Sequence, residues 1–192
     1  MQKKRWMKKI KKKDSMNLKK LFLVIITFAG LILQGFAQEQ AFPVPTGNSK
    51  QLFYLQRTHN TNTIVYELNY KDGVIDAENP VLPVWIRYQE QGQRKELSFI
   101  QRKFAYGLKT KKISETQYEL SFVSYKNYKF YLRQGTDKKF SVYININEKP
   151  AILTRIFIQM NGGSFWSPNI EYVEVSGIEP KSHSIVKERI KI

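Results

Sequence analysis

The chain has 192 residues, of which 42% are hydrophobic and 14% aromatic, so it can bury a core and is not wholly disordered, collagenous or coiled coil. It contains no cysteine, which excludes disulfides, thiolate metal sites and thiol catalysis. Its net charge is +16, but residues 1–37 hold ten Lys or Arg and one Asp, and the rest of the chain carries only +7. Because that remaining charge is dispersed, we expect no nucleic-acid partner.

The N-terminal region is predicted to be a signal peptide. Two lysines precede an uncharged apolar run at residues 21–33, and small residues follow at Gly35 and Ala37. These positions predict cleavage between Ala37 and Gln38. A membrane-spanning helix is the competing interpretation, but a span needs roughly 20 apolar residues, so we expect no transmembrane segment in the mature chain.

The first residues suggest two possible starts. Met16 begins a conventional leader, whereas residues 1–15 form a lysine-rich extension that a leader does not need. The alternative is an unusually long basic region starting at Met1. In both cases residues 1–37 lie outside the fold, and the mature protein is expected to be exported to the periplasm or the extracellular space.

Beyond the leader, residues 38–50 contain two prolines and a glycine and predict an extended lead-in. Residues 51–180 are predicted to form a single domain, followed by a polar C-terminal tail at residues 181–192. The continuously apolar stretch Leu52–Leu55 indicates a central strand covered on both faces. Alternating apolar residues predict further strands at residues 64–70, 82–88, 118–122, 128–132, 140–146 and 152–160.

One segment departs from this alternation. Leu97, Ile100 and Phe104 have helical spacing, and Gly107 stands where a helix would end. Residues 97–106 therefore predict a short amphipathic helix that covers the sheet. The predicted fold class is mainly β, an antiparallel sandwich or partly open barrel with one short helix.

A first candidate ligand site lies in the connection between the first two predicted strands. Arg57, His59, Asn60 and Asn62 place a cation, an imidazole and two amides within six residues, which suits a carboxylate or a sugar. The alternative, which we favour, is that both asparagines cap a tight turn through side-chain to backbone hydrogen bonds.

A second candidate is the outward face of the later hairpins, where aromatic rings alternate with cations. If these side chains point outward together, bases, sugars or anionic polymers could stack on them. We favour the alternative that the rings lie under the predicted helix, and that Trp85 and Trp166 are core or rim residues. The residues of this face are Lys129, Tyr131, Arg133, Tyr143, Asn145, Arg155, Phe157 and Gln159.

The sequence offers no familiar catalytic centre. His59 is the one histidine inside the predicted domain, so zinc or Ser-His-Asp chemistry lacks its second member, and we expect no metal and no cofactor. The stretch DGVIDAE at residues 72–78 lacks the EF-hand spacing and predicts a hairpin turn with a solvated acidic stretch. A glycosidase would need two facing carboxylates, for which Glu67, Glu119 and Glu171 are candidates.

Several short motifs stand out along the predicted domain, at Phe53, Tyr54, Arg57, Asn60, Asn62, Val65, Tyr66, Pro80, Val81, Trp85, Ile86, Ala105, Tyr106 and Gly107. These motifs resemble the DUF4833 domain family of uncharacterised secreted Bacteroidetes proteins. The resemblance spans about residues 50–175 and implies export to a Gram-negative envelope, but no catalytic residues. It adds Trp85 and Tyr106 to the candidate ligand-binding residues.

The sequence therefore predicts an exported, non-enzymatic β domain that binds a polar or anionic ligand or an envelope protein. The alternative is a hydrolase or lyase that acts on polysaccharide or peptidoglycan. A carrier of apolar ligands in a hollow barrel is a third possibility, which the high aromatic content disfavours because these rings would fill the interior.

Overall fold

The computed structural model describes residues 42–164 and 166–191. The predicted signal peptide, its cleavage site at Ala37 and Gln38, and both possible start residues lie outside this range. Residues Phe42–Ile192 form one compact unit.

Strands dominate this unit, as the alternating sequence pattern predicts. A two-residue pairing, β3 (Tyr70–Lys71) with β4 (Val74–Ile75), forms a separate small hairpin. The other eleven strands form one sheet: β1 (Gln51–Arg57), β2 (Asn60–Leu68), β5 (Val81–Arg87), β6 (Gln93–Glu96), β7 (Leu108–Ser114), β8 (Gln117–Phe122), β9 (Lys129–Gln134), β10 (Phe140–Ile146), β11 (Lys149–Gly163), β12 (Pro168–Ile178) and β13 (Ile185–Lys191).

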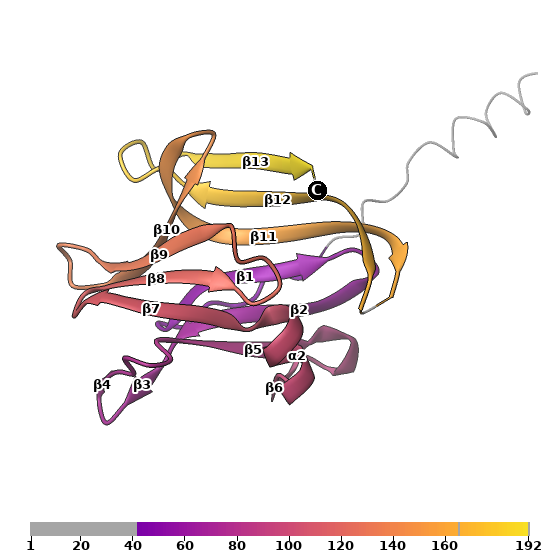
Figure 1. Ribbon diagram of the computed structural model, residues 1–192, viewed down its shortest axis with the longest axis horizontal. Helices are drawn as coiled ribbons and strands as arrows, with labels where there is room; N and C mark the ends of the chain where they lie inside the picture. Colours follow the sequence, from indigo (N-terminus) through magenta and orange to yellow (C-terminus); the bar gives the residue numbers. More distant parts are fainter. Residues whose placement is uncertain (1–41, 165, 192) are drawn as a thin grey trace, which may run out of the picture. The chain divides into compact units, whose positions relative to one another are not determined.

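The long strand β11 organises this sheet (Figure 1). β12 pairs with it along residues 152–163, so its other edge is shared by β10, at residues 149–152, and by β1, at residues 155–158. The β1 pairing is parallel, and the remaining pairings of the sheet are antiparallel. Two wings therefore start from one edge: β1–β2–β5–β6 and β10–β9–β8–β7.

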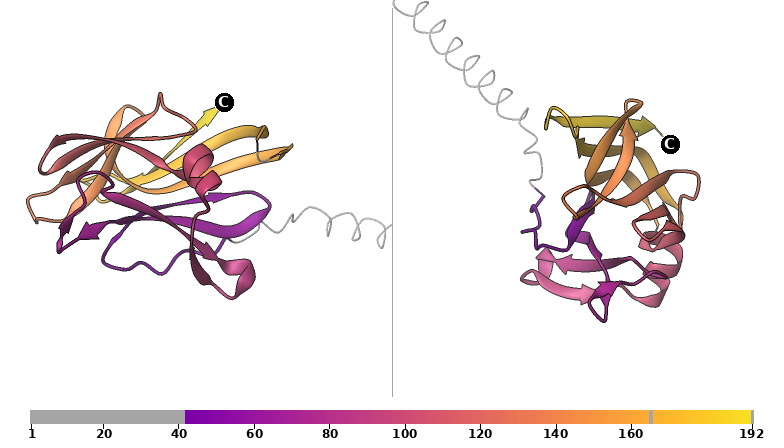
Figure 2. Two further views of the ribbon diagram at one scale, coloured as in Figure 1. Left: turned by 60° about the horizontal axis from the view of Figure 1, so that its bottom comes forward. Right: turned by 90° about the vertical axis from the view of Figure 1, so that its left-hand side faces the viewer.

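The wings curl toward each other into a half-barrel, and the core fills the space between them (Figure 2). An aromatic cluster joins the wings. Phe53 of β1 stacks on Tyr66 of β2 with ring centres 4.4 Å apart, and its edge meets Phe130 of β9 at 6.0 Å. Phe122 of β8 contacts both Tyr66 and Phe130. The predicted class, mainly antiparallel β with one short helix, is confirmed, and β1 is central as expected.

The predicted helix exists but presents a different face. Ser98 and Gln101 form a capping box, in which each side chain accepts a hydrogen bond from the backbone N–H of the other. The helical residues are α2 (Phe99–Gln101), which continues as the π-helical turn η2 (Arg102–Tyr106). Leu97 is buried just before the helix, but Ile100 and Phe104, predicted to face the sheet, are exposed.

The helix ends at Gly107, whose backbone lies close against the first residue of η2. A Cβ at this position would lie 1.9 Å from the carbonyl oxygen of Arg102. Gly107 is extended rather than left-handed, so it is needed for close approach.

Both ends of the described chain belong to the unit. The lead-in packs on the outer side of β1, where Gln56 donates to the carbonyl of Pro43 and the ring of Phe42 meets Phe157 edge-on. Residues 181–192, predicted as a polar tail, instead supply β13, whose seven residues pair with β12. The segment was predicted as a tail because four of the seven residues of β13 are charged, although exposed and half-buried positions alternate along it.

Candidate functional site

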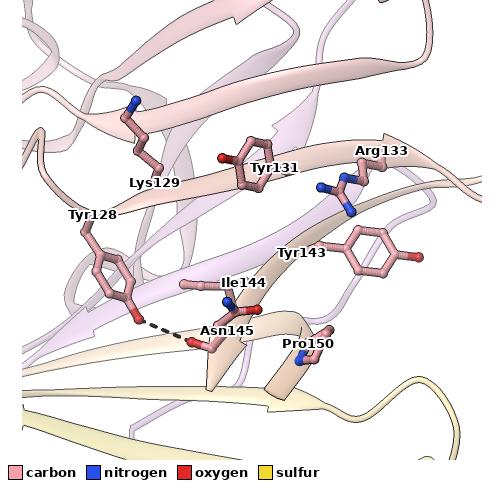
Figure 3. A pocket seen from close by; sticks show the side chains of 8 residues that line it. All are labelled: Tyr128, Lys129, Tyr131, Arg133, Tyr143, Ile144, Asn145 and Pro150. Carbon is pink, nitrogen blue, oxygen red and sulfur yellow. Dashed lines mark hydrogen bonds between the residues drawn. The ribbon is translucent and has the colours of Figure 1, made fainter. Parts of the chain in front are cut away.

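A surface hollow of about 360 Å³ opens on the outer face of the wing that contains β9 and β10 (Figure 3). Its size falls within the range typical of small-molecule pockets. Three tyrosines, two cations and an amide dominate its lining. The lining residues are Tyr128, Lys129, Tyr131, Arg133, Tyr143, Ile144, Asn145 and Pro150.

The alternation of the two strands places these side chains outside. Phe130 and Leu132 of β9 are fully buried in the core, so Tyr131, which lies between them, points to the opposite face. Tyr143 of β10 is directly opposite Tyr131 in the antiparallel register, which brings the two phenol rings onto one surface. The half-buried tyrosines therefore form the floor of the hollow.

Arg133 is held over this aromatic floor. Its guanidinium carbon Cζ lies 4.9 Å from the ring centre of Tyr131 and 5.9 Å from that of Tyr143, both within cation–π range. It forms no ion pair with any of the described residues. The guanidinium of Arg133 thus brings a positive charge to the hollow that no described carboxylate compensates.

Lys129 is already partly neutralised, because its Nζ lies 2.8 Å from a carboxylate oxygen of Glu119. This hydrogen bond raises the pKa of Lys129, so the ammonium stays charged at neutral pH. At the other end, the Tyr128 hydroxyl donates to the carbonyl of Asn145 at 3.5 Å. Burial raises the pKa of Tyr128, which keeps this phenol neutral. Arg133 is therefore the main electrostatic attraction for an anion.

The interpretation that these rings pack under the helix is wrong for Tyr131 and Tyr143, which line the hollow. The predicted face also divides in two. Phe157 is buried beneath Phe42 of the lead-in, and Arg155 donates from Nε to the Oε1 atom of Gln56 at 2.9 Å. Arg155, Phe157 and Gln159 are absent from the hollow, because β11 pairs with β10 only at residues 149–152 and with β1 at residues 155–158.

The first predicted site is the β1–β2 hairpin turn. Arg57 pairs with Asn60, and His59 adopts a left-handed conformation, with φ of 61°, between them. The Oδ1 atom of Asn60 accepts a hydrogen bond from the backbone N–H of Asn62. Asn60 therefore caps the turn, as the favoured interpretation predicts.

Asn62 is occupied as well. Its side-chain amide donates to Gln89, and its oxygen accepts from the Gln89 backbone N–H at 3.0 Å, in the turn η1 (Tyr88–Glu90). Asn60 thus fixes the backbone of its own turn, and Asn62 fixes the backbone of η1. Arg57, exposed His59, Asn60 and Asn62 are close together, and their role in ligand binding stays a prediction.

The two residues added by resemblance lie elsewhere. Trp85, on β5, is paired with Ile64 and is half-buried against the core, and its indole Nε1 is buried without a hydrogen-bond partner in the described part of the chain. The carbonyl of Tyr106 accepts a hydrogen bond from the buried Tyr66 hydroxyl at 2.9 Å. Burial raises the pKa of Tyr66 well above its usual value, so this phenol remains a donor.

Two of the candidate catalytic carboxylates are engaged in ion pairs, and the third is exposed outside the hollow. Glu67 is buried and accepts two hydrogen bonds of 2.6 Å from Arg94, while Glu119 is paired with Lys129. Glu171 is exposed on β12, and the lining of the hollow contains no Asp or Glu. Within residues 42–164 and 166–191 no group of three His, Cys, Asp or Glu could hold a metal ion.

The acidic stretch at residues 72–78 is a turn, as expected. Asp72 and Gly73 have positive φ values and connect β3 to β4. The Oδ1 atom of Asp76 accepts hydrogen bonds from the backbone N–H groups of Glu78 and Asn79. Across residues 42–164 and 166–191, every helix is too short or too polar to cross a bilayer.

Three lining residues, Tyr128, Ile144 and Pro150, were absent from the predicted face. Pro150, the second residue of β11, lies directly opposite Asn145, and this register brings it to the hollow. Alternation places Tyr128 in one row with the buried Phe130 and Leu132, so the sequence pattern does not predict Tyr128 at the hollow.

These features define a mainly antiparallel β domain that carries an aromatic and basic hollow on one outer face. Residues 53–189, from β1 into β13, match the family described as a domain of unknown function, DUF4833. The chain belongs to this family. No curated protein and no solved structure matches it.

Proposed function

We propose that this protein is a non-enzymatic binding module, and that its ligand is an acidic saccharide held in the hollow around Arg133. The single observation that carries this proposal is an arginine stacked on two outward tyrosines with no carboxylate paired to it. A guanidinium binds carboxylate and sulfate oxygens in a fork, and phenol rings pack against the C–H faces of sugars. Asn145 adds an amide for sugar hydroxyls.

Binding without catalysis fits the lack of carboxylates in the lining better than a polysaccharide hydrolase does. A glycosidase needs a proton donor and a second carboxylate about 5 to 9.5 Å away across the sugar. Glu119 reaches Lys129 from outside the lining, and the hydrogen bonds from Arg94 hold the pKa of Glu67 below its usual value. Glu67 is therefore not suited to donate a proton at neutral pH.

The hollow can be tested by titrating the purified protein with an oligouronate and with a neutral oligosaccharide of equal length, followed by calorimetry. The oligouronate should bind more tightly. Arg133→Gln should weaken its binding about ten-fold or more, because a charged hydrogen bond contributes about 1.5–3 kcal/mol. Lys71→Gln, on the separate β3–β4 hairpin, removes the same charge and should have no effect. Equal affinity of wild type and Arg133→Gln would contradict the proposal.

We further propose that the protein is exported by a bacterium of the Bacteroidetes and acts in the periplasm or outside the cell. The apolar run at residues 21–33 and the small residues Gly35 and Ala37 support this address. Mass spectrometry of the protein from its native envelope should find Gln38 as the first residue. An intact Met1 or Met16 on a cytosolic product would refute export.

A further inference from the structure

A second surface, distinct from the hollow, combines exposed rings from two parts of the chain. Phe99, Ile100 and Phe104 of the helix are 69%, 46% and 50% exposed, and Trp166, in the turn between β11 and β12, is 68% exposed. The rings of Phe104 and Trp166 meet edge-on with centres 5.8 Å apart, which joins the helix to this turn (both strands and α2 are labelled in Figure 1). We call these four residues, three aromatic side chains and Ile100, the aromatic face.

The helix is fixed so that this face points away from the core. The Ser98 and Gln101 capping box sets its start, and buried Leu97 and half-buried Tyr106 hold its two ends against the sheet. Single exposed apolar residues are ordinary, but a cluster of large ones contributed by two elements marks a surface for association.

The charge around the aromatic face is one-sided. The cations of the helix are Arg102 and Lys103; residues 97–106 contain no Asp or Glu, and residues 159–170 contain no charged residue. The ammonium of Lys103 lies 5.2 Å from the ring centre of Phe99 and 5.5 Å from that of Phe104, so a cation stands among the exposed rings. Glu96, just before this segment, reaches Arg102 at 3.8 Å and leaves Lys103 uncompensated.

This combination favours a lipid surface over a protein groove. Phe and Trp side chains partition into the interface between lipid headgroups and acyl chains, while neighbouring lysines bind anionic headgroups. The helix is only two turns long, which suits shallow insertion and not a span.

We propose that the aromatic face docks on the surface of a membrane that contains anionic lipids. Phe99, Phe104 and Trp166 would enter the interface, and Lys103 and Arg102 would contact the headgroups. Docking would not involve the residues that line the hollow.

The absence of cysteine from the chain allows a local test in the full-length protein. A single cysteine is introduced as Phe104→Cys, or as Val74→Cys on the β3–β4 hairpin, which is 67% exposed and serves as the control. Each is labelled with a fluorophore that is sensitive to its environment. Vesicles are prepared from phosphatidylcholine alone or with phosphatidylglycerol, with and without a nitroxide-labelled lipid. Because the label reports only on its own surroundings, tethering through another segment cannot imitate insertion.

With phosphatidylglycerol vesicles, the label at residue 104 should shift its emission to shorter wavelength and be quenched by the nitroxide, while the label at residue 74 should not. Adding Lys103→Gln should raise the lipid concentration needed about five-fold, since one lysine near an anionic surface contributes about 1 kcal/mol. Lys71→Gln should leave it unchanged.

Three results would overturn the proposal. The label at residue 104 could remain in water with both kinds of vesicle, which would point to a protein partner. It could respond equally to neutral vesicles, which would remove the role of Lys103. It could also report an apolar environment before vesicles are added, which would mean that another part of the chain or a second copy covers this face.

Discussion

At the scale of single residues, the ion pair of Glu67 and Arg94 shows how the fold uses a buried charge. The Glu67 carboxylate is 5% exposed on the outer side of β2, and both its oxygens accept hydrogen bonds from Arg94 of β6. Asn48 of the lead-in donates a third hydrogen bond. These donors compensate for burial, so the pair connects β2, β6 and the lead-in.

Removing one partner leaves the buried carboxylate poorly satisfied, and Arg94→Ala should lower the free energy of unfolding by about 1–3 kcal/mol. Arg87→Ala, at the end of the neighbouring strand β5, breaks the surface ion pair of Arg87 with Glu90 of η1. This substitution should lower the free energy of unfolding by less than about 1 kcal/mol. Urea denaturation at neutral pH measures both. Equal losses would show that the Glu67 pair is no stronger than a surface pair.

The same comparison should depend on pH. The hydrogen bonds from Arg94 lower the pKa of Glu67 in the folded state despite burial, so the pair stabilises the protein above the unfolded pKa of about 4.3. This contribution is lost as the pH falls through the folded pKa. The difference between wild type and Arg94→Ala should therefore be largest near pH 7 and shrink in acid.

At the scale of strands, the alternation of apolar residues predicted where most of the strands would form. It did not predict which residues face the core beyond a β-bulge. In β11 the buried residues are Ala151 and Leu153, then Ile156 and Phe157, because a register shift lies between Leu153 and Arg155. The sequence pattern had instead assigned Ile152 to the same row as Ile156. A bulge depends on the neighbouring strand, so a single-strand pattern does not reveal it.

The last strand offers a test of the corrected domain boundary. Val186 and Ile190 of β13 pack against the core, whereas Ile185 is 73% exposed. Ile190→Ser should lower the free energy of unfolding by about 1–2 kcal/mol through lost burial, and Ile185→Ser should change it by less than about 0.5 kcal/mol. If both variants unfold like wild type in urea, residues 185–191 contribute nothing to the stability of the domain and behave as a polar tail.

The candidate site illustrates the same limit. Its β9 and β10 members, Tyr131, Arg133 and Tyr143, could be identified as outward residues because buried neighbours flank them. Whether an outward ring is covered depends on the position of the helix, which packs its Tyr106 end near Tyr66. In the β1–β2 turn, the occupation of Asn62 depends on Gln89, a residue 27 positions away. Such long-range partners are not encoded in local spacing.

At the scale of the whole described unit, one long strand and one aromatic cluster define the architecture. β11 supplies the edge from which both wings extend, and the rings of Phe53, Tyr66, Phe122 and Phe130 join them. The hollow lies on the outer face of one wing, where its floor is the reverse side of core strands. A site built on paired strands is held more rigidly than one built on a loop, which suits a preformed binding surface.

We propose that Tyr131, Arg133 and Tyr143 bind an anionic saccharide. The most direct measurement is an NMR titration of the isotope-labelled protein with an oligouronate, following backbone amides and the Arg133 Nε–H resonance. We predict saturable shifts at these three residues, while residues 57–62 of the β1–β2 turn remain unchanged. Shifts confined to residues 57–62, or no saturable shift at Arg133, would contradict saccharide binding in the hollow.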